Sequence, residues 1–157
     1  MKPFIDFIRF LIISPEFLIL LVAFVLYEFF SDYLVIITLL ISKKTEMIKH
    51  FALVPSFIMI AIFKMAKSLL FPEKDKKEIL QSWPDYYKLK LGFEVAILYS
   101  ILFAIIGILG WALDWNETSP LPALGLLTAL FGSSTVFITT YKAEITINET
   151  FARENDR

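Results

Sequence analysis

Long apolar blocks separated by short polar segments dominate the pattern along the chain. Two of them, residues 95–113 and 120–141, contain no Asp, Glu, Lys or Arg. A helix of about 20 apolar residues spans the roughly 30 Å hydrocarbon core of a bilayer, since each residue adds about 1.5 Å. Only the segment DWNETS separates the two blocks, and Ser119 followed by Pro120 is typical of a helix start. We therefore expect two antiparallel membrane helices with a short connection.

Two earlier blocks also have the length of a membrane span. Residues 15–41 follow Ser14, whose hydroxyl, next to a proline and an acid, is typical of a helix N-cap. Residues 51–71 form the weaker span because Lys64 and Lys67 interrupt the apolar pattern. The opening stretch MKPFIDFIRFLII mixes charged and aromatic residues, as interfacial helices do.

This pattern predicts an all-α, polytopic membrane protein with four transmembrane helices and a short N-terminal interfacial helix. The expected parts are an interfacial N-terminal segment 1–14, a four-helix transmembrane domain 15–141 with spans at about 15–41, 51–71, 93–113 and 120–141, a cytoplasmic loop 72–90 and a charged cytoplasmic tail 142–157.

Composition agrees with lipid as the main solvent of these side chains. Of 157 residues, 57% are hydrophobic, with a mean hydropathy of +0.69, whereas soluble domains are about 45–50% apolar. The net charge of −1 creates no field that would attract nucleic acid. Cysteine is absent, His50 is the single histidine, and no P-loop, dinucleotide-binding, GxSxG or HExxH motif occurs. We expect the protein to have the lipid bilayer as its partner. We do not expect it to be an enzyme, and we expect no catalytic residues, no metal and no cofactor.

The distribution of basic residues predicts the side of the membrane on which each polar segment lies. Segments 1–14, 64–90 and 142–157 carry twelve of the fifteen Lys and Arg residues, and residues 42–50 carry the other three. The positive-inside rule then places both termini in the cytoplasm, and we expect a bacterial inner membrane. The lysines of ISKKTEMIKH argue against this orientation, because they fall on the opposite side.

Two acids, Glu28 and Asp32, interrupt the first predicted span. Residues four apart share a helix face, and Glu28 lies about 20 Å along the axis if the helix starts at Pro15. A carboxylate that faces lipid at this depth costs on the order of 3 kcal/mol. One interpretation is an ion or proton site that faces a bundle interior or a wet cavity. In the alternative, residues 10–30 cross the membrane and both acids emerge among the outer headgroups.

Small residues recur at intervals of four in the last two predicted spans. The two sets are Gly125, Ala129 and Ser133, and Ala96, Ser100 and Ala104. This spacing lets helix backbones approach closely in lipid, either within one chain or at a subunit interface.

Hydroxyl groups are frequent in the last span, at Thr128, Ser133, Ser134, Thr135, Thr139 and Thr140. Such groups either line a narrow polar path or bond to the carbonyl oxygen one turn back.

The leading functional hypothesis is a small oligomeric membrane module that anchors or signals to a cytosolic partner through the 72–90 loop and the tail. The alternative is an ion channel or transporter that uses Glu28, Asp32 and the hydroxyls of the last span, and a membrane enzyme is the third hypothesis. In span count, size and short charged tail, the chain resembles the small four-span membrane subunits of bacterial phage-defence operons, such as the membrane component of Kiwa. The resemblance implies sensing of membrane perturbation and a cytosolic effector partner.

Overall fold

The computed structural model describes residues 2–42, 50–70, 86–112 and 119–155 of the chain. These residues form helices α1 (Lys2–Ile13), α2 (Pro15–Ser42), α4 (Val54–Leu70), α6 (Tyr86–Ala112) and α7 (Leu121–Asn155). The prediction of an all-α protein is confirmed. Most of the predicted loop 72–90 lies outside the described residues, and its last residues belong to α6.

Three of the described helices are long and apolar enough to cross a membrane, namely Pro15–Ile41, Tyr86–Gly110 and Leu121–Glu149. The prediction of a fourth such helix, over residues 51–71, is wrong. α4 begins only at Val54 and has 17 residues, so it is about 25 Å long at about 1.5 Å per residue, short of the roughly 30 Å of hydrocarbon. Its exposed Lys64 and Lys67 shorten the apolar part further.

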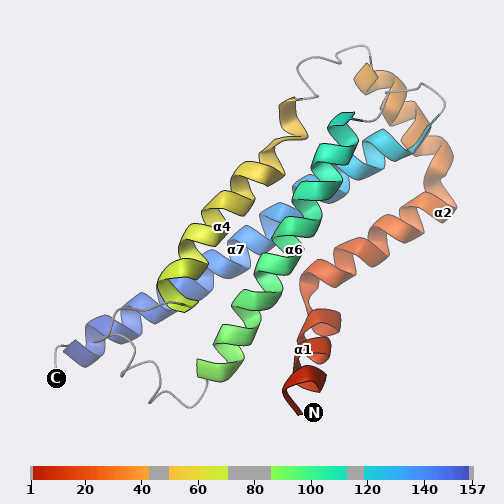
Figure 1. Cartoon of the computed structure of the whole chain (residues 1–157). Helices are drawn as coiled ribbons and strands as arrows, with labels where there is room; N and C mark the ends of the chain where they lie inside the picture. Colours follow the sequence, from red (N-terminus) through yellow and green to blue (C-terminus); the bar gives the residue numbers. More distant parts are fainter. Residues whose placement is uncertain (1, 43–49, 71–85, 113–118, 156–157) are drawn as a thin grey trace.

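Successive long helices alternate in direction (Figure 1). α2 and α6 run away from the end of the bundle that holds α1, whereas α4 and α7 run back toward it. α6 packs against both α7 and α4, and α7 also contacts α2 and α4. The start of α2 and the end of α7 therefore lie toward the same end of the molecule (Figure 1).

Many large apolar side chains lie on the outside of this bundle, and its interior includes small and hydroxyl-bearing side chains beside apolar ones. Phe29 and Phe131 are 77% and 65% exposed, whereas Ser100 and Ser133 are fully buried. Water-soluble proteins show the opposite tendency, because exposed apolar surface is unfavourable in water. The distribution, together with the three apolar helices, indicates a membrane protein.

The centre of the bundle is built on one face of α6. Tyr99 and Phe103 stack there with ring centroids 6.1 Å apart, and Ile62 of α4 and Val136 of α7 close the cluster around them. Gly132 of α7 lies directly against the Phe103 ring, where a Cβ atom would overlap it. The absence of a side chain at this position therefore lets α7 approach the largest fully buried side chain of the core.

A second glycine brings α4 close to α6. A Cβ atom at Gly107 would lie 2.5 Å from the backbone oxygen of Ala52, just before α4, and 3.3 Å from Cγ of Pro55, in its first turn. By contrast, a Cβ atom at Gly92, on the same helix, would meet nothing within 4 Å. These two of the three glycines of α6 thus differ in purpose: Gly107 permits a helix crossing, and Gly92 faces open space.

α2 is kinked at Phe30, which has the non-helical angles φ −128° and ψ 22°. The kink occurs although the helix contains no glycine and no proline after its first residue. Beyond it, Leu34 and Thr38 are buried. Before it, Phe17 and Leu20 are half-buried and pack against the central cluster. Both parts of α2 on either side of the kink therefore contact the rest of the bundle.

Gly107 and Gly92 of α6 provide a matched test of this packing. Gly107→Ala should destabilise the protein by about 1–3 kcal/mol, because the added methyl group meets backbone atoms that cannot rotate away. Gly92→Ala should stabilise it by about 0.5–1 kcal/mol, since alanine loses less backbone entropy in a helix. Thermal unfolding of both variants in detergent, followed by circular dichroism, measures the difference. Equal melting temperatures would contradict the close approach of α4 and α6.

Candidate functional site

The junction between α1 and α2 is an elbow built around Ser14. The Ser14 hydroxyl accepts a hydrogen bond from the Phe17 amide (3.2 Å) and donates one to the Leu11 carbonyl (3.0 Å). It thereby satisfies one of the free amides at the start of α2 and one of the free carbonyls at the end of α1. The predicted N-cap at Ser14 is confirmed, and α7 has the equivalent bond from the Leu121 amide to the Ser119 hydroxyl (3.3 Å).

α1 is held against α6 by a polar contact and by apolar packing. The Tyr99 hydroxyl donates to the Leu11 carbonyl oxygen at 2.8 Å, across 88 residues of sequence. Phe7 and Leu11 pack against the central cluster from the same side. The short N-terminal helix is thus part of the tertiary structure.

Glu16 connects the elbow to α7. Its side chain is only 5% exposed, and the Thr139 hydroxyl lies 3.2 Å from its Oε1 atom. The same hydroxyl is 3.1 Å from the carbonyl oxygen of Thr135 and 2.9 Å from that of Val136. A hydroxyl has one hydrogen to donate, so these three contacts are alternatives for one proton. Thr139 can therefore exchange a bond within its own helix for a bond to Glu16.

Two adjacent cavities open at this end of the bundle. The larger, of about 640 Å³, lies between α1, the start of α2, α6 and α7, and the smaller, of about 380 Å³, lies between α6 and α7. They share Lys88, Gly92, Ala96 and Thr139 as lining residues. We call the two cavities together the elbow cleft. The charged or polar side chains that line it are Asp6, Arg9, Ser14, Glu16, Tyr87, Lys88, Thr139 and Thr140.

Most charged groups of the elbow cleft line its exposed part, and its buried part is lined by apolar groups together with Glu16. Asp6, Arg9 and Lys88 are all exposed, whereas Val95 is buried. Gly92 adds no side chain to the space between them. The cleft therefore has the amphipathic character of a site for a molecule with a polar and an apolar part.

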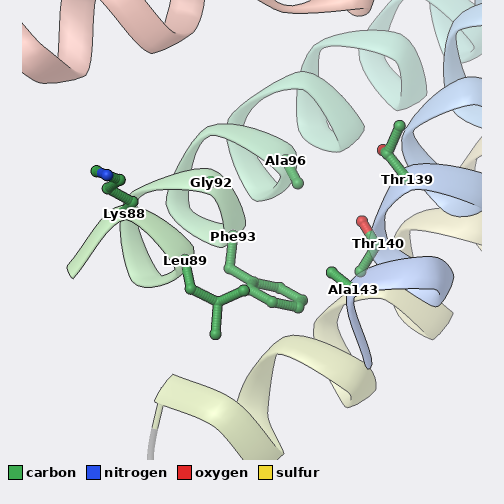
Figure 2. Close-up of a pocket in the computed structure, with 8 residues that line it drawn as sticks. All are labelled: Lys88, Leu89, Gly92, Phe93, Ala96, Thr139, Thr140 and Ala143. Atoms are coloured by element: carbon green, nitrogen blue, oxygen red, sulfur yellow. The ribbon is translucent and has the colours of Figure 1, made fainter. Parts of the chain in front are cut away.

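The smaller cavity contains a hydroxyl that has no partner (Figure 2). Thr140 is 3% exposed, and its Oγ1 atom is buried without a hydrogen bond in the described part of the chain. Figure 2 shows the hydroxyl oxygens of Thr139 and Thr140 on the side of α7 that faces α6, near Ala96. Lys88 extends away from the α7 residues (Figure 2) and also lines the larger cavity.

Glu28 and Asp32 lie on α2, away from the elbow cleft. Both are exposed, and the non-helical Phe30 stands between them. A spacing of four residues places side chains on one face only in a continuous helix, so this inference does not apply across the kink. Glu28 follows Glu16 by about 18 Å of helix at about 1.5 Å per residue. Among the described residues, no group of three His, Cys, Asp or Glu side chains gathers as a metal site would require.

The small residues of the last two long helices are mostly used for packing within one chain. Ala129 and Ser133 of α7 and Ser100 and Ala104 of α6 are buried. At Gly125, a Cβ atom would lie 3.9 Å from Cγ2 of Ile106 on α6. Ala96 is partly exposed, packs against the central cluster and also lines the elbow cleft.

Several hydroxyls of α7 bond to their own helix. Ser133 donates to the Leu130 carbonyl at 3.2 Å, and Thr135 donates to that of Phe131 at 3.0 Å. Such bonds satisfy a hydroxyl where lipid offers no partner. Among the hydroxyls of α7, those of Thr139 and Thr140 line the cleft, where groups outside their own helix can approach them.

No motif in the sequence indicates that the charged residues of the elbow cleft form a site. Asp6 and Arg9 appeared as part of an interfacial helix, and Glu16 as a residue suited to a helix start. Glu16 and Thr139 are 123 positions apart, and no pattern along the chain relates them. The one feature of the sequence that could have indicated the cleft is the presence of an acidic and a basic residue among the aromatic residues of segment 1–13.

The fold and the cleft define a helical membrane protein with an amphipathic cavity at one end of its bundle. No model of a known protein family matches the chain, and neither curated proteins nor solved structures match it significantly. Its function therefore has to be inferred from its own residues.

The contact between α1 and α6 yields a second prediction. Tyr99→Phe removes the bond to the Leu11 carbonyl and should lower stability by about 1 kcal/mol, the usual net value of a hydrogen bond. Release of α1 should also accelerate tryptic cleavage after Arg9. Tyr27→Phe, at an exposed position of α2, is the matched control. If the two variants resist trypsin equally well, the Tyr99 bond does not hold α1 in place.

Proposed function

We propose that this protein is a small inner-membrane module that anchors a cytosolic partner and reports the state of the surrounding bilayer to it. The observation that carries the proposal is the continuity of α7. This helix runs without interruption from Leu121 to Asn155. It therefore joins the apolar part of the bundle to the charged segment that begins at Lys142.

Packing holds the charged end of α7 in place. Ile147 is 1% exposed and contacts a cluster with Ala66 of α4 and Phe93 of α6. The opposite side of this segment is exposed, with Tyr141, Lys142, Ile145, Asn148 and Glu149 on it. A helix that is fixed on one side and exposed on the other offers a surface for a partner protein.

The elbow gives the module a route for sensing. α1 is the kind of helix that lies among headgroups, and the elbow that follows it contacts α7 through Glu16 and Thr139. A change in bilayer packing that moves α1 would therefore act on the helix that carries the exposed surface. The resemblance to phage-defence subunits adds the proposal that the partner is an antiviral effector.

We further propose that both termini face the cytoplasm and that several copies assemble. α4 is shorter than the three apolar helices, but it runs beside α6. We propose that it returns the chain across the membrane in contact with protein. Assembly would give Glu28 and Asp32 a covered environment, because each carboxylate costs on the order of 3 kcal/mol when it faces lipid.

The orientation can be tested directly because the natural chain has no cysteine. Single substitutions Tyr87→Cys and Asn148→Cys should react with a membrane-impermeant maleimide in inverted vesicles, whereas Phe51→Cys should react in spheroplasts. Ile105→Cys, on the apolar outer face of α6, should react in neither, since lipid suppresses thiolate formation. Labelling of Asn148→Cys and Phe51→Cys from the same side would refute the proposed topology.

Two isoleucines of the charged end of α7 test the partner surface. Ile147→Ala should lower stability by about 2–5 kcal/mol because it empties a packed site. Ile145→Ala, at a position that is 40% exposed, should leave the melting temperature unchanged but weaken retention of the cytosolic partner. Quantitative pull-down with mass spectrometry, together with the particle mass of the same preparation, measures both binding and copy number. Equal retention by Ile145→Ala and the natural chain, or none by either, would contradict the proposed surface.

A further inference from the structure

The elbow cleft has the dimensions and the setting of a binding site for an amphiphile. Its cavities measure about 640 and 380 Å³, within the range of about 300–1,000 Å³ that is common for small-molecule sites. It opens where the charged residues of α1 meet the first turns of α6, and buried apolar residues lie behind them. Lipids of the membrane are the amphiphiles nearest to such an opening.

Gly92 keeps this space open. It lines both cavities, and a Cβ atom at this position would meet no atom within 4 Å. Glycine in a helix interior is unfavourable relative to alanine, so its presence is not explained by packing here. A ligand that lies against the backbone of α6 would explain it.

Thr140 provides an independent sign of a ligand. Its hydroxyl is buried and has no hydrogen-bond partner among the described residues, although Thr135 and Thr146 on the same helix bond to carbonyls one turn back. A buried donor without an acceptor is unfavourable. The ester carbonyl of a glycerolipid is an acceptor of the right kind for a site that is otherwise apolar.

The charges of the larger cavity select the headgroup. Arg9 and Lys88 offer donors for a phosphate, which arginine binds particularly well. Asp6 and Glu16 balance these two charges, and Asp6 lies three residues from Arg9 on α1, so the two side chains are neighbours on one helix face. A headgroup that carries both a phosphate and an amine matches this arrangement better than one with a phosphate alone.

We propose that the elbow cleft binds a phospholipid with an amine in its headgroup, such as phosphatidylethanolamine. The phosphate lies at Arg9 and Lys88, the amine lies at the carboxylates of Asp6 and Glu16, and an ester carbonyl accepts a hydrogen bond from Thr140. An acyl chain lies against Gly92. The inference rests on the proposed membrane setting but not on the cytosolic partner.

Native mass spectrometry of the full chain in detergent, titrated with phosphatidylethanolamine, measures the affinity. Gly92→Phe should weaken binding at least tenfold by filling the cleft, and Arg9→Gln should weaken it similarly by removing the guanidinium group. Ile105→Phe and Lys64→Gln, at exposed sites outside the cleft, are the matched controls and should bind as the natural chain does. If Gly92→Phe fails to fold, as judged by circular dichroism and monodispersity, Arg9→Gln decides the outcome.

Thr140→Val tests the hydroxyl separately. It should weaken lipid binding several-fold without lowering the melting temperature, because the hydroxyl has no protein partner to lose. Thr38→Val is the control, since that hydroxyl donates to the Leu34 carbonyl at 2.9 Å and is not part of the cleft. Unchanged lipid affinity in Thr140→Val would overturn the role of this hydroxyl.

Three other titrants identify the recognised group. Phosphatidylglycerol and diacylglycerol with the same acyl chains should bind at least tenfold more weakly than phosphatidylethanolamine, and glycerophosphoethanolamine should not displace it. Equal affinity for phosphatidylglycerol would overturn the role of the amine, and equal affinity for diacylglycerol would overturn that of the phosphate. Displacement by glycerophosphoethanolamine would identify a soluble headgroup compound as the ligand instead of a lipid. Because no partner protein is present, none of these results depends on the partner surface of α7.

Discussion

Hydroxyl groups inside this bundle bond to carbonyl oxygens of their own helices, as Ser100 does with Ile97 at 2.8 Å. The constraint behind this arrangement is the absence of water: a polar group that lipid surrounds must find its partner within the protein. The same constraint allows large aromatic residues such as Phe29 to cover the outside. It also explains why helices approach through small residues, since lipid gives no hydrophobic drive for helices to associate and close contact must supply the attraction.

Departures from this rule occur in two places: at Ser56, near the start of α4, whose buried hydroxyl has no partner among the described residues, and around the elbow cleft. Glu16 is a buried acid whose described partner is the shared hydroxyl of Thr139, and Thr140 has a hydroxyl with none. Both residues line the elbow cleft, beside a glycine that faces open space. The combination of a buried acid, a hydroxyl without a partner and open space at one site is more readily explained by a ligand or a conformational change than by stability.

α7 is the element that relates this cleft to the rest of the molecule. It contacts α2, α4 and α6, lines both cavities through Thr139, and ends in a charged segment fixed by Ile147. A ligand at the elbow would bias the contact between Glu16 and Thr139. The proposed sensing therefore needs only that the Thr139 hydroxyl change its hydrogen-bond acceptor among Glu16, Thr135 and Val136, since α7 is one continuous helix.

The apolar blocks of the sequence determined the all-α fold, the short connection before Pro120 and the helix starts at Ser14 and Ser119, because span length and N-cap chemistry are local properties. They predicted too long a helix over residues 51–71, because the helix begins later than the apolar block does. The spacing of Glu28 and Asp32 suggested a shared face, but the backbone at Phe30 is not helical, and no local residue signals that kink. The elbow cleft was decided by the tertiary structure alone. It joins residues 6–16, 87–96 and 139–143, and contacts over such separations depend on how whole helices pack, which periodicity along one segment cannot encode.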